Sequence, residues 1–194
     1  MRRLCVFCGS SAGRDPVYRQ SAEQLAEAMV ARGIDLVYGG GHVGLMGVIA
    51  DAVAARGGHV IGVIPHALVA KEVAHQRLAD LRVVESMHER KATMARLADG
   101  FIAMPGGFGT FEEIFEAVTW TQLGLHAKRC GVLNVDGYFD GLLMLLNRAV
   151  DEGFLKETNR QLLAVSGDPA ALLDRLAVPL TPSPDKWIRS LDET

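Results

Sequence analysis

The chain alternates short apolar runs with longer amphipathic segments, and this alternation restricts its possible folds more than any other feature. The runs are apolar at successive positions and partly β-branched, which is typical of strands covered on both faces. They span residues 4–8, 34–38, 59–64, 81–85, 100–104 and 130–135. The segments between them have helical spacing of apolar residues, end in glycine, and span residues 17–33, 43–58, 87–100, 110–124 and 138–153. Strands that alternate with helices predict a doubly wound parallel sheet, an α/β fold with helices on both faces.

The size and composition fit one folded domain. The chain has 194 residues, of which 49% are hydrophobic, and this is enough for one well-buried core. We expect a single domain over residues 1–180, with a longer and partly helical connection at 66–80. Residues 181–194 read TPSPDKWIRSLDET, and their prolines and mixed charges predict an extended surface arm.

The charge balance argues against several classes of partner. A formal net charge of −3 and an isoelectric point near 6.1 leave no basic footprint, so we expect no nucleic-acid partner and no membrane partner. No apolar run reaches the length that spans a membrane. The first residues, MRRLCVFCGSS, turn to glycine and serine too early for a signal peptide. We therefore expect a cytoplasmic protein.

The cysteines and histidines do not form a recognisable metal site. Cys5 and Cys8 make a C-x-x-C, but both lie in one predicted strand, where side chains three positions apart point to opposite faces. With Cys130 the count is odd, so we expect buried structural cysteines and no disulfide framework. The six histidines show no paired ligand spacing, and we predict no bound metal.

Glycine collects at three predicted strand ends. The first run is followed by Gly9, Ser10 and Ser11, the second by GGGHVGLMG at 39–47, and the fifth by PGGFGT at 105–110. Glycine permits close backbone approach, and helix N-termini present amides with partial positive charge. One such loop alone is more often a tight turn. Two glycine-rich turns that lead from strands of one sheet into helices favour a phosphate-bearing ligand.

The details of these turns favour a mononucleotide. Residues 39–44 formally contain G-x-G-x-x-G, but the acid that a dinucleotide site requires about 20 residues later is replaced by Ile64, Pro65 and His66. The motif also follows the second strand instead of the first. No G-x-x-x-x-G-K-[ST] is present, which excludes a P-loop kinase or ATPase.

Charged residues flank the third glycine turn and a neighbouring helix. Thr110 and Glu113 fit a capping box at a helix that Thr110 would open, and this structural explanation is at least as good as a catalytic one. A carboxylate there would also face the ribose of a nucleotide whose phosphate sits on the turn, and could stabilise positive charge at C1′. Arg90 and Lys91 open another helix, where cations are unfavourable unless they meet an anion.

These motifs resemble one enzyme family. The segments CVFCGSS, YGGGHVGLMG, MHERK, PGGFGTFEE, TWTQLGLHAK and GVLNVDGYFDGLL, within residues 5–154, are similar to the LONELY GUY (LOG) family. The resemblance implies a Rossmann-like homodimer, with a larger oligomer left open. It also implies hydrolysis of AMP or N6-modified AMP to free base and ribose 5-phosphate, an N-glycosidase reaction without metal or cofactor.

The resemblance also implies roles for particular residues. By position in PGGFGTFEE, Glu113 is the catalytic carboxylate and Arg90 its partner, while Gly107, Gly109 and Thr110 hold the phosphate. The full set of implied substrate-binding residues is Ser10, Gly41, Gly44, Met46, Gly47, Glu72, Lys91, Gly107, Phe108, Gly109, Thr110, Phe111, Glu112 and Thr119. Many family members have tyrosine or an aliphatic residue at the positions of Phe108 and Phe111, and this difference bears on base preference.

Two other functions remain open at this point. The family's former label of lysine decarboxylase predicts pyridoxal phosphate on a lysine, for which Lys91 is the sole plausible candidate. The second alternative is a non-catalytic carrier of a nucleotide or of the molybdenum cofactor. Such a carrier would use the glycine loops but would need neither Glu113 nor Arg90.

Overall fold

The fold is built on one parallel β-sheet. The computed structural model describes residues 1–69, 74–75 and 78–180. The described strands are β1 (Arg3–Phe7), β2 (Asp35–Tyr38), β3 (Val60–Pro65), β4 (Asp80–Val84), β5 (Gly100–Ala103), β6 (Arg129–Leu133) and β7 (Leu163–Ser166). They lie in the order β4-β3-β2-β1-β5-β6-β7, and every neighbouring pair is parallel. The doubly wound sheet expected from the sequence is therefore confirmed.

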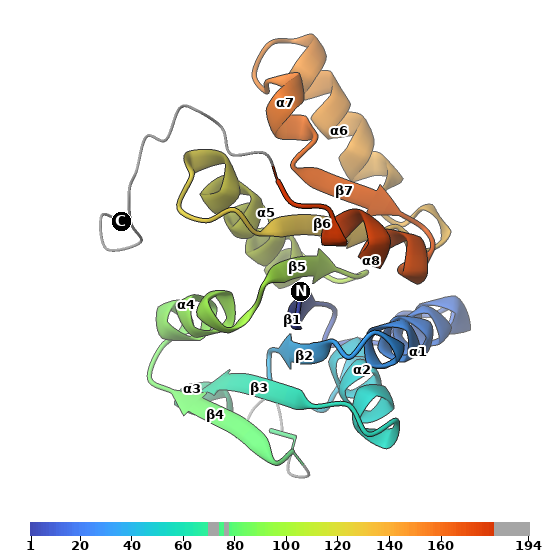
Figure 1. Cartoon of the computed structure of the whole chain (residues 1–194), viewed down its shortest axis with the longest axis vertical. Helices are drawn as coiled ribbons and strands as arrows, with labels where there is room; N and C mark the ends of the chain where they lie inside the picture. Colours follow the sequence, from blue (N-terminus) through green and yellow to red (C-terminus); the bar gives the residue numbers. More distant parts are fainter. Residues whose placement is uncertain (70–73, 76–77, 181–194) are drawn as a thin grey trace.

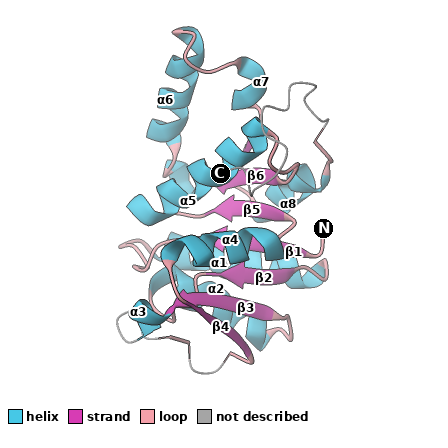
Figure 2. Ribbon diagram, turned by 90° about the vertical axis from the view of Figure 1, so that its left-hand side faces the viewer, coloured by secondary structure: helices cyan, strands magenta, loops and turns pink. Residues whose placement is uncertain are grey.

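Helices cover both faces of the sheet (Figures 1 and 2). They are α1 (Pro16–Ala31), α2 (Gly44–Ala55), α3 (His66–Val69), α4 (Met87–Leu97), α5 (Phe108–Leu123), α6 (Asp140–Asp151), α7 (Glu157–Arg160) and α8 (Pro169–Ala177), with a 3-10 turn at Val135–Gly137. One face carries α1, α2 and α8, and the other carries α4 and α5 (Figure 1). The pair α6 and α7 stands beyond the β7 edge of the sheet (Figure 1).

The strands have the all-apolar composition of a two-sided core because both of their faces are buried. Leu4 and Val6 of β1 belong to the core cluster under α1 and α2, whereas Cys5 belongs to the cluster under α4 and α5. Cys8 lies in the first of these clusters, so the two cysteines of the C-x-x-C face opposite layers as predicted. All three cysteines are free and buried. In the described part of the chain, no helix is long and apolar enough to cross a membrane.

The sequence analysis found six of the strands but missed the last strand and helix. β7 has four residues, too few for a clear apolar pattern, and α8 follows it directly. The available signal was the start of α8, where Asp168 caps the helix by accepting a hydrogen bond from the Ala171 amide and Pro169 occupies its first turn. The partly helical character of the 66–80 connection is confirmed by α3. The arm proposed for 181–194 lies outside the described residues, and the division into domains stays a prediction.

His126, in the turn between α5 and β6, is packed among aromatic rings. Its ring centroid lies 5.4 Å from that of Phe101 and 6.3 Å from that of Trp120. Nδ1 accepts a 3.3 Å hydrogen bond from the Lys128 amide, which assigns the proton of the neutral ring to Nε2. Nε2 is buried without a hydrogen-bond partner among the described residues. Burial, followed by the positive charge of Lys128, lowers the pKa of His126 to about 4.

We predict that His126 makes the fold sensitive to acid. Its pKa is about 4 in the folded chain against an ordinary value of 6.5, so the unfolded chain binds more protons between these values. The stabilisation is therefore complete above pH 6.5 and is lost as the pH falls toward 4, by roughly 2–4 kcal/mol. Urea unfolding at pH 7 and pH 4.5 should show a smaller loss for His126→Phe than for the wild type. His59→Phe, at a half-exposed histidine, is the control, and equal losses in all three proteins would contradict the prediction.

Candidate active site

Three glycine loops meet at the carboxyl ends of the central strands. We define them as residues 9–13 after β1, 39–43 after β2 and 104–107 after β5. The Gly9 amide donates to the Pro105 carbonyl at 3.0 Å, and the Gly9 carbonyl accepts from the Leu45 amide at 3.0 Å. The first loop is thus hydrogen-bonded to the third loop and to the first turn of α2. After β1 the chain adds β2 on one side of this strand, and it later adds β5 on the other side. Such a reversal of strand order is a topological switch point, where open α/β sheets bind their ligands.

Close backbone contacts explain two of the glycines in these loops. Gly44 has φ +61°, and a Cβ placed there would lie 2.2 Å from the carbonyl carbon of Ser10. A Cβ on Gly106 would lie 2.2 Å from Thr110 Oγ1 and 2.8 Å from the Gly9 nitrogen. Neither position has room for a larger residue, so the loops can approach one another only with glycine at these points.

The helix α5 begins earlier than the capping-box pattern predicts, and this corrects the sequence analysis. Its N-cap is Gly107, and the first intrahelical hydrogen bond runs from the Phe111 amide to the Gly107 carbonyl at 3.1 Å. Thr110 is therefore inside the first turn, and Glu113 lies in the second, too far along to pair with Thr110 as a cap. The amides of residues 108–110 precede the first intrahelical bond, and they give the third loop the positive end of a 16-residue helix.

The side chains around this helix start differ in their exposure. Thr110 is buried and sits against Gly106, whereas Phe108 is 91% exposed. The hydroxyl of Tyr138, in the turn before α6, donates to the Gly106 carbonyl at 2.5 Å and supports the third loop. Sequence reasoning missed Tyr138; its one signal was an aromatic residue just after the strand end at residue 133.

Arg90 projects from α4 into the carboxyl end of the sheet and is only 6% exposed. Nε donates to the Val63 carbonyl at 3.1 Å, and Nη2 donates to the Gly39 carbonyl at 2.7 Å. A Cβ on Gly39 would lie 2.1 Å from Nη2, so the second loop requires glycine there for the guanidinium to fit. These bonds fix the guanidinium plane against the ends of β2 and β3. Arg90, expected on electrostatic grounds to meet an anion, is thus buried at the edge where the loops converge.

Glu113 lies on the inner side of α5, partly buried. Burial, then the negative charge of Glu113, raise the pKa of the Cys5 thiol, while the charge of Arg90 lowers it. Burial and Glu113 also raise the pKa of Cys8, which directly precedes the first loop. The carboxylate of Glu113 and the guanidinium of Arg90 therefore both act on β1, although they come from different helices. The two residues that the family resemblance paired lie on α4 and α5, which cover the same face of the sheet (Figure 1).

Lys91 connects the two helices that carry these charges. Its Nζ lies 2.5 Å from Glu112 Oε1 and 2.9 Å from Glu116 Oε1, both on α5. Burial alone would lower the pKa of Lys91, but the hydrogen bonds with Glu112 and Glu116 outweigh it, and the pKa lies above its ordinary value. Lys91 and Glu112, both expected to contact substrate, are thus paired with each other, and Lys91, Glu113 and Glu116 line one small cavity beside Phe7.

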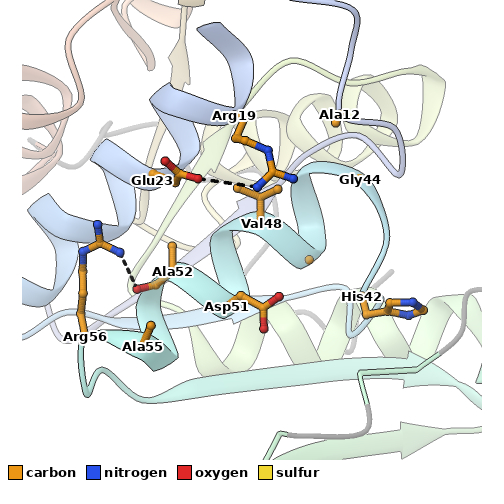
Figure 3. A pocket seen from close by; sticks show the side chains of 11 residues that line it. Ala12, Arg19, Glu23, His42, Gly44, Val48, Asp51, Ala52, Ala55 and Arg56 are labelled. Atoms are coloured by element: carbon orange, nitrogen blue, oxygen red, sulfur yellow. Dashed lines mark hydrogen bonds and ion pairs between the residues drawn. The ribbon is translucent and has the colours of Figure 1, made fainter. Parts of the chain in front are cut away.

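The remaining predicted residues are spread over more than one surface. Gly44 and Gly47 line a groove of about 420 Å³ between α1 and α2, and Figure 3 shows Arg19 and Arg56 on its walls. Ser10 is exposed, whereas Gly41 of the second loop and Met46 of α2 are buried.

The structure does not gather every predicted residue at the loops. Thr119 is exposed on the outer side of α5 and lines a different, apolar groove next to α6. Glu72 lies outside the described residues. Among the described residues, no group of three or more histidine, cysteine or acidic side chains could hold a metal ion.

Comparisons with known proteins agree on one family. A family model described as "Possible lysine decarboxylase" matches residues 46–176. The cytokinin riboside 5'-monophosphate phosphoribohydrolase LOG2 of Arabidopsis thaliana is 50% identical over 190 residues, which cover 98% of this chain and 89% of the relative. The enzyme LOG of Oryza sativa subsp. japonica, with the same activity in its name, is 53% identical over 162 residues, or 84% of this chain and 67% of the relative.

Solved structures of the same fold include more distant proteins. The molybdenum cofactor carrier protein of Chlamydomonas reinhardtii superposes with a TM-score of 0.68 at 20% identity, over 90% of this chain and 97% of the carrier. At this identity the likeness concerns the fold alone. The relatives near 50% identity and the family model decide the membership: this chain belongs to the LOG family of cytokinin riboside 5'-monophosphate phosphoribohydrolases.

Proposed function

We propose that this chain hydrolyses the N-glycosidic bond of adenosine 5'-monophosphates, either AMP itself or its N6-substituted forms, to free base and ribose 5-phosphate. The observation that carries the proposal is that Arg90 and Glu113 come from α4 and α5, two helices that Lys91 joins, with Arg90 bound to the Val63 and Gly39 carbonyls. Both charges act on the Cys5 thiol, and Glu113 also acts on Cys8 at the start of the first glycine loop. Relatives named for this reaction share about half of their residues with the chain.

The glycine loops suit the phosphate of the substrate. The amides of residues 108–110 at the start of α5, with Gly107 before them, carry the positive end of the helix dipole. Glu113 follows Thr110 by three residues, a rise of about 4.5 Å along the helix. A nucleotide anchored by its 5'-phosphate at the helix start would therefore present its ribose, and not its phosphate, to the Glu113 carboxylate.

The chemistry follows from this arrangement. Cleavage of the C1′–N bond leaves its electron pair with the base and develops positive charge on the sugar, which an ionised Glu113 stabilises. Water adds its oxygen to C1′, and its proton passes through Glu113, while the departing base takes up a proton. Arg90, fixed by the Val63 and Gly39 carbonyls, supplies a positive charge that favours the ionised form of a nearby carboxylate and orients the base.

The alternatives are less well supported. A pyridoxal phosphate enzyme needs a lysine that loses its proton readily, but the pKa of Lys91 is raised by its two carboxylate partners. The carrier function draws support only from structures near 20% identity. A purified protein without the yellow colour of a Schiff base would argue against the first alternative. Release of adenine from AMP would argue against the second.

We also propose that the protein is a homodimer in the cytoplasm. α6 has no buried residue, and Met144 and Leu145 are 68% and 64% exposed on it. Beside them, Phe115 and Leu142 help to line an apolar groove of about 230 Å³ between α5 and α6. An exposed apolar surface of this kind supports burial against a second copy. The cytoplasmic location is supported by the three cysteines, all of which are free.

The catalytic part predicts that Glu113→Gln abolishes base release while the protein stays folded. Gln keeps the shape of the side chain but cannot stabilise the cationic sugar, so the rate should fall at least about 100-fold. The assay follows adenine release from AMP and from N6-isopentenyl-AMP. Glu116→Gln, the same change one turn further along α5, is the matched control and should lose less than about fivefold. Turnover by Glu113→Gln near the wild-type rate would reject the proposed role.

The assembly part predicts that the wild type sediments as a dimer at micromolar concentration. The double variant Met144→Glu, Leu145→Glu should sediment as a monomer, because two charges cannot be buried in an apolar interface. Val178→Glu, at an apolar residue that is also more than half exposed and lies elsewhere on the chain, should leave the dimer intact. A wild type that sediments as a monomer would contradict the proposal. A wild type that sediments as a larger oligomer, and that the double variant converts to a smaller species, would show that this surface takes part in a larger assembly.

A further inference from the structure

The guanidinium of Arg90 depends on the second glycine loop, and that loop needs its own support. Nη2 of Arg90 donates to the Gly39 carbonyl at 2.7 Å. A glycine-rich loop has little intrinsic stiffness, because glycine has access to more backbone conformations than any other residue. Whatever holds residues 39–41 therefore also determines where the acceptor for Arg90 lies.

Residues 74 and 75 hold this loop from one side. The His75 amide donates to the Gly40 carbonyl at 3.1 Å, and Ala74 forms an antiparallel bridge with Gly41. The backbone of the loop is thus paired with a short extended segment from the connection that follows α3. The pairing reaches Gly40, the residue next to the acceptor of Arg90.

The side chain of His75 is in turn tied to α2. His75 is only 4% exposed, and its Nε2 lies 3.1 Å from Asp51 Oδ1. Figure 3 shows Asp51 projecting from α2 on the same side as the loop residue His42. The contact requires the proton of the neutral imidazole on Nε2, which leaves Nδ1, buried without a hydrogen-bond partner among the described residues, as a bare lone pair.

These contacts form a closed ring around the loop. α2 begins at Gly44, directly after residues 39–43, and Asp51 lies two turns along it. From Asp51 the ring passes through His75 to Gly40 and returns along the loop to α2. The charge of Asp51 also acts on the last residue of β2, because burial and then this charge raise the pKa of Tyr38. The second loop, residues 74–75 and α2 are therefore held together next to the Gly39 carbonyl that accepts from Arg90.

We propose that Asp51 and His75 are positioning residues for Arg90. Their contact holds the Gly39 carbonyl where Nη2 of Arg90 needs it and so orients the guanidinium toward the substrate. The catalytic consequence rests on the proposed function; the structural one, an ordered Arg90 side chain, does not.

The first experiment measures the order of Arg90 without any assay of activity. The ¹⁵N–¹H signal of Arg90 Nε is assigned by its loss in Arg90→Lys, and its exchange with water is measured in each variant. His75→Ala and Asp51→Ala should speed this exchange at least tenfold. His75→Gln, whose amide nitrogen reaches the same point, and Asp51→Asn, which keeps the acceptor oxygen, should stay within twofold of the wild type. His59→Ala, which removes a histidine 3.7 Å from an aspartate at the other end of the sheet, is the matched control.

The second experiment measures turnover of AMP by the same variants. His75→Ala and Asp51→Ala should lower kcat roughly 10- to 100-fold with KM within threefold, because a displaced catalytic group weakens the transition state more than the ground state. His75→Gln and Asp51→Asn should restore most of kcat. If His75→Ala does not fold, the two Asp51 variants decide the matter, since that side chain is 54% exposed.

The outcomes separate this proposal from the proposed function. Exchange at Arg90 Nε that is unchanged in Asp51→Ala and in His75→Ala overturns the positioning role, whatever the kinetics show. A wild type without activity on any adenosine monophosphate overturns the proposed function, while the exchange measurement still decides whether Asp51 and His75 order Arg90. Faster exchange in Asp51→Ala that Asp51→Asn reverses supports the positioning role.

Discussion

A buried arginine is the constraint on which this site depends. A guanidinium with 6% exposure is costly unless its donors are satisfied, and here two of them are taken by the carbonyls of Val63 and Gly39. The two carbonyls are available to Arg90 because the pairing of β2 with β3 stops at Tyr38 and Gly62, while β3 continues to Pro65 beside β4. Gly39 must lack a side chain for the guanidinium to reach it. Sheet topology, loop composition and the position of α4 are thus linked through one charge.

The second charged residue of the candidate site, Glu113, lies on a different helix from Arg90. Glu113 enters from α5 after the helix has presented its amides to the third loop, while Arg90 enters from α4, and β1 lies between them. Lys91 spans the two helices by its contacts with Glu112 and Glu116 and so links α4 to α5 next to Glu113. The buried thiol of Cys5 lies in the field of both charges and has a pKa raised by burial first. It therefore stays protonated and takes no part as a nucleophile.

The sequence was sufficient for those features that depend on local pattern. Apolar runs predict strands because strands buried on both faces are apolar at successive positions. The glycine-rich turns predict a binding site at the carboxyl edge of the sheet because glycine lets the loops there approach one another closely. The start of α5 was predicted wrongly, since Thr110 and Glu113 match a capping box by spacing, whereas the cap is Gly107. The contact of Asp51 with His75 joins residues 24 positions apart. No local pattern reports such a contact, because it arises only when α2 and the connection after α3 pack on the same loop.

Fold and chemistry are carried by different parts of this molecule. The crossing of the chain between β1 and β5, with a helix N-terminus over a glycine loop, provides a place for an anionic group on any chain that builds it. The molybdenum cofactor carrier protein of Chlamydomonas reinhardtii shares this fold at 20% identity. Under the proposed function, cleavage of the glycosidic bond needs in addition the carboxylate of Glu113, about one helical turn from the start of α5, and the cation of Arg90. The positions of these two side chains depend on local details, such as the absence of a side chain at Gly39, in addition to the sheet that all these proteins share. Likeness of fold to carriers and likeness of sequence to hydrolases are therefore compatible, and under the proposed function the activity depends on the residues that hold Arg90 and Glu113.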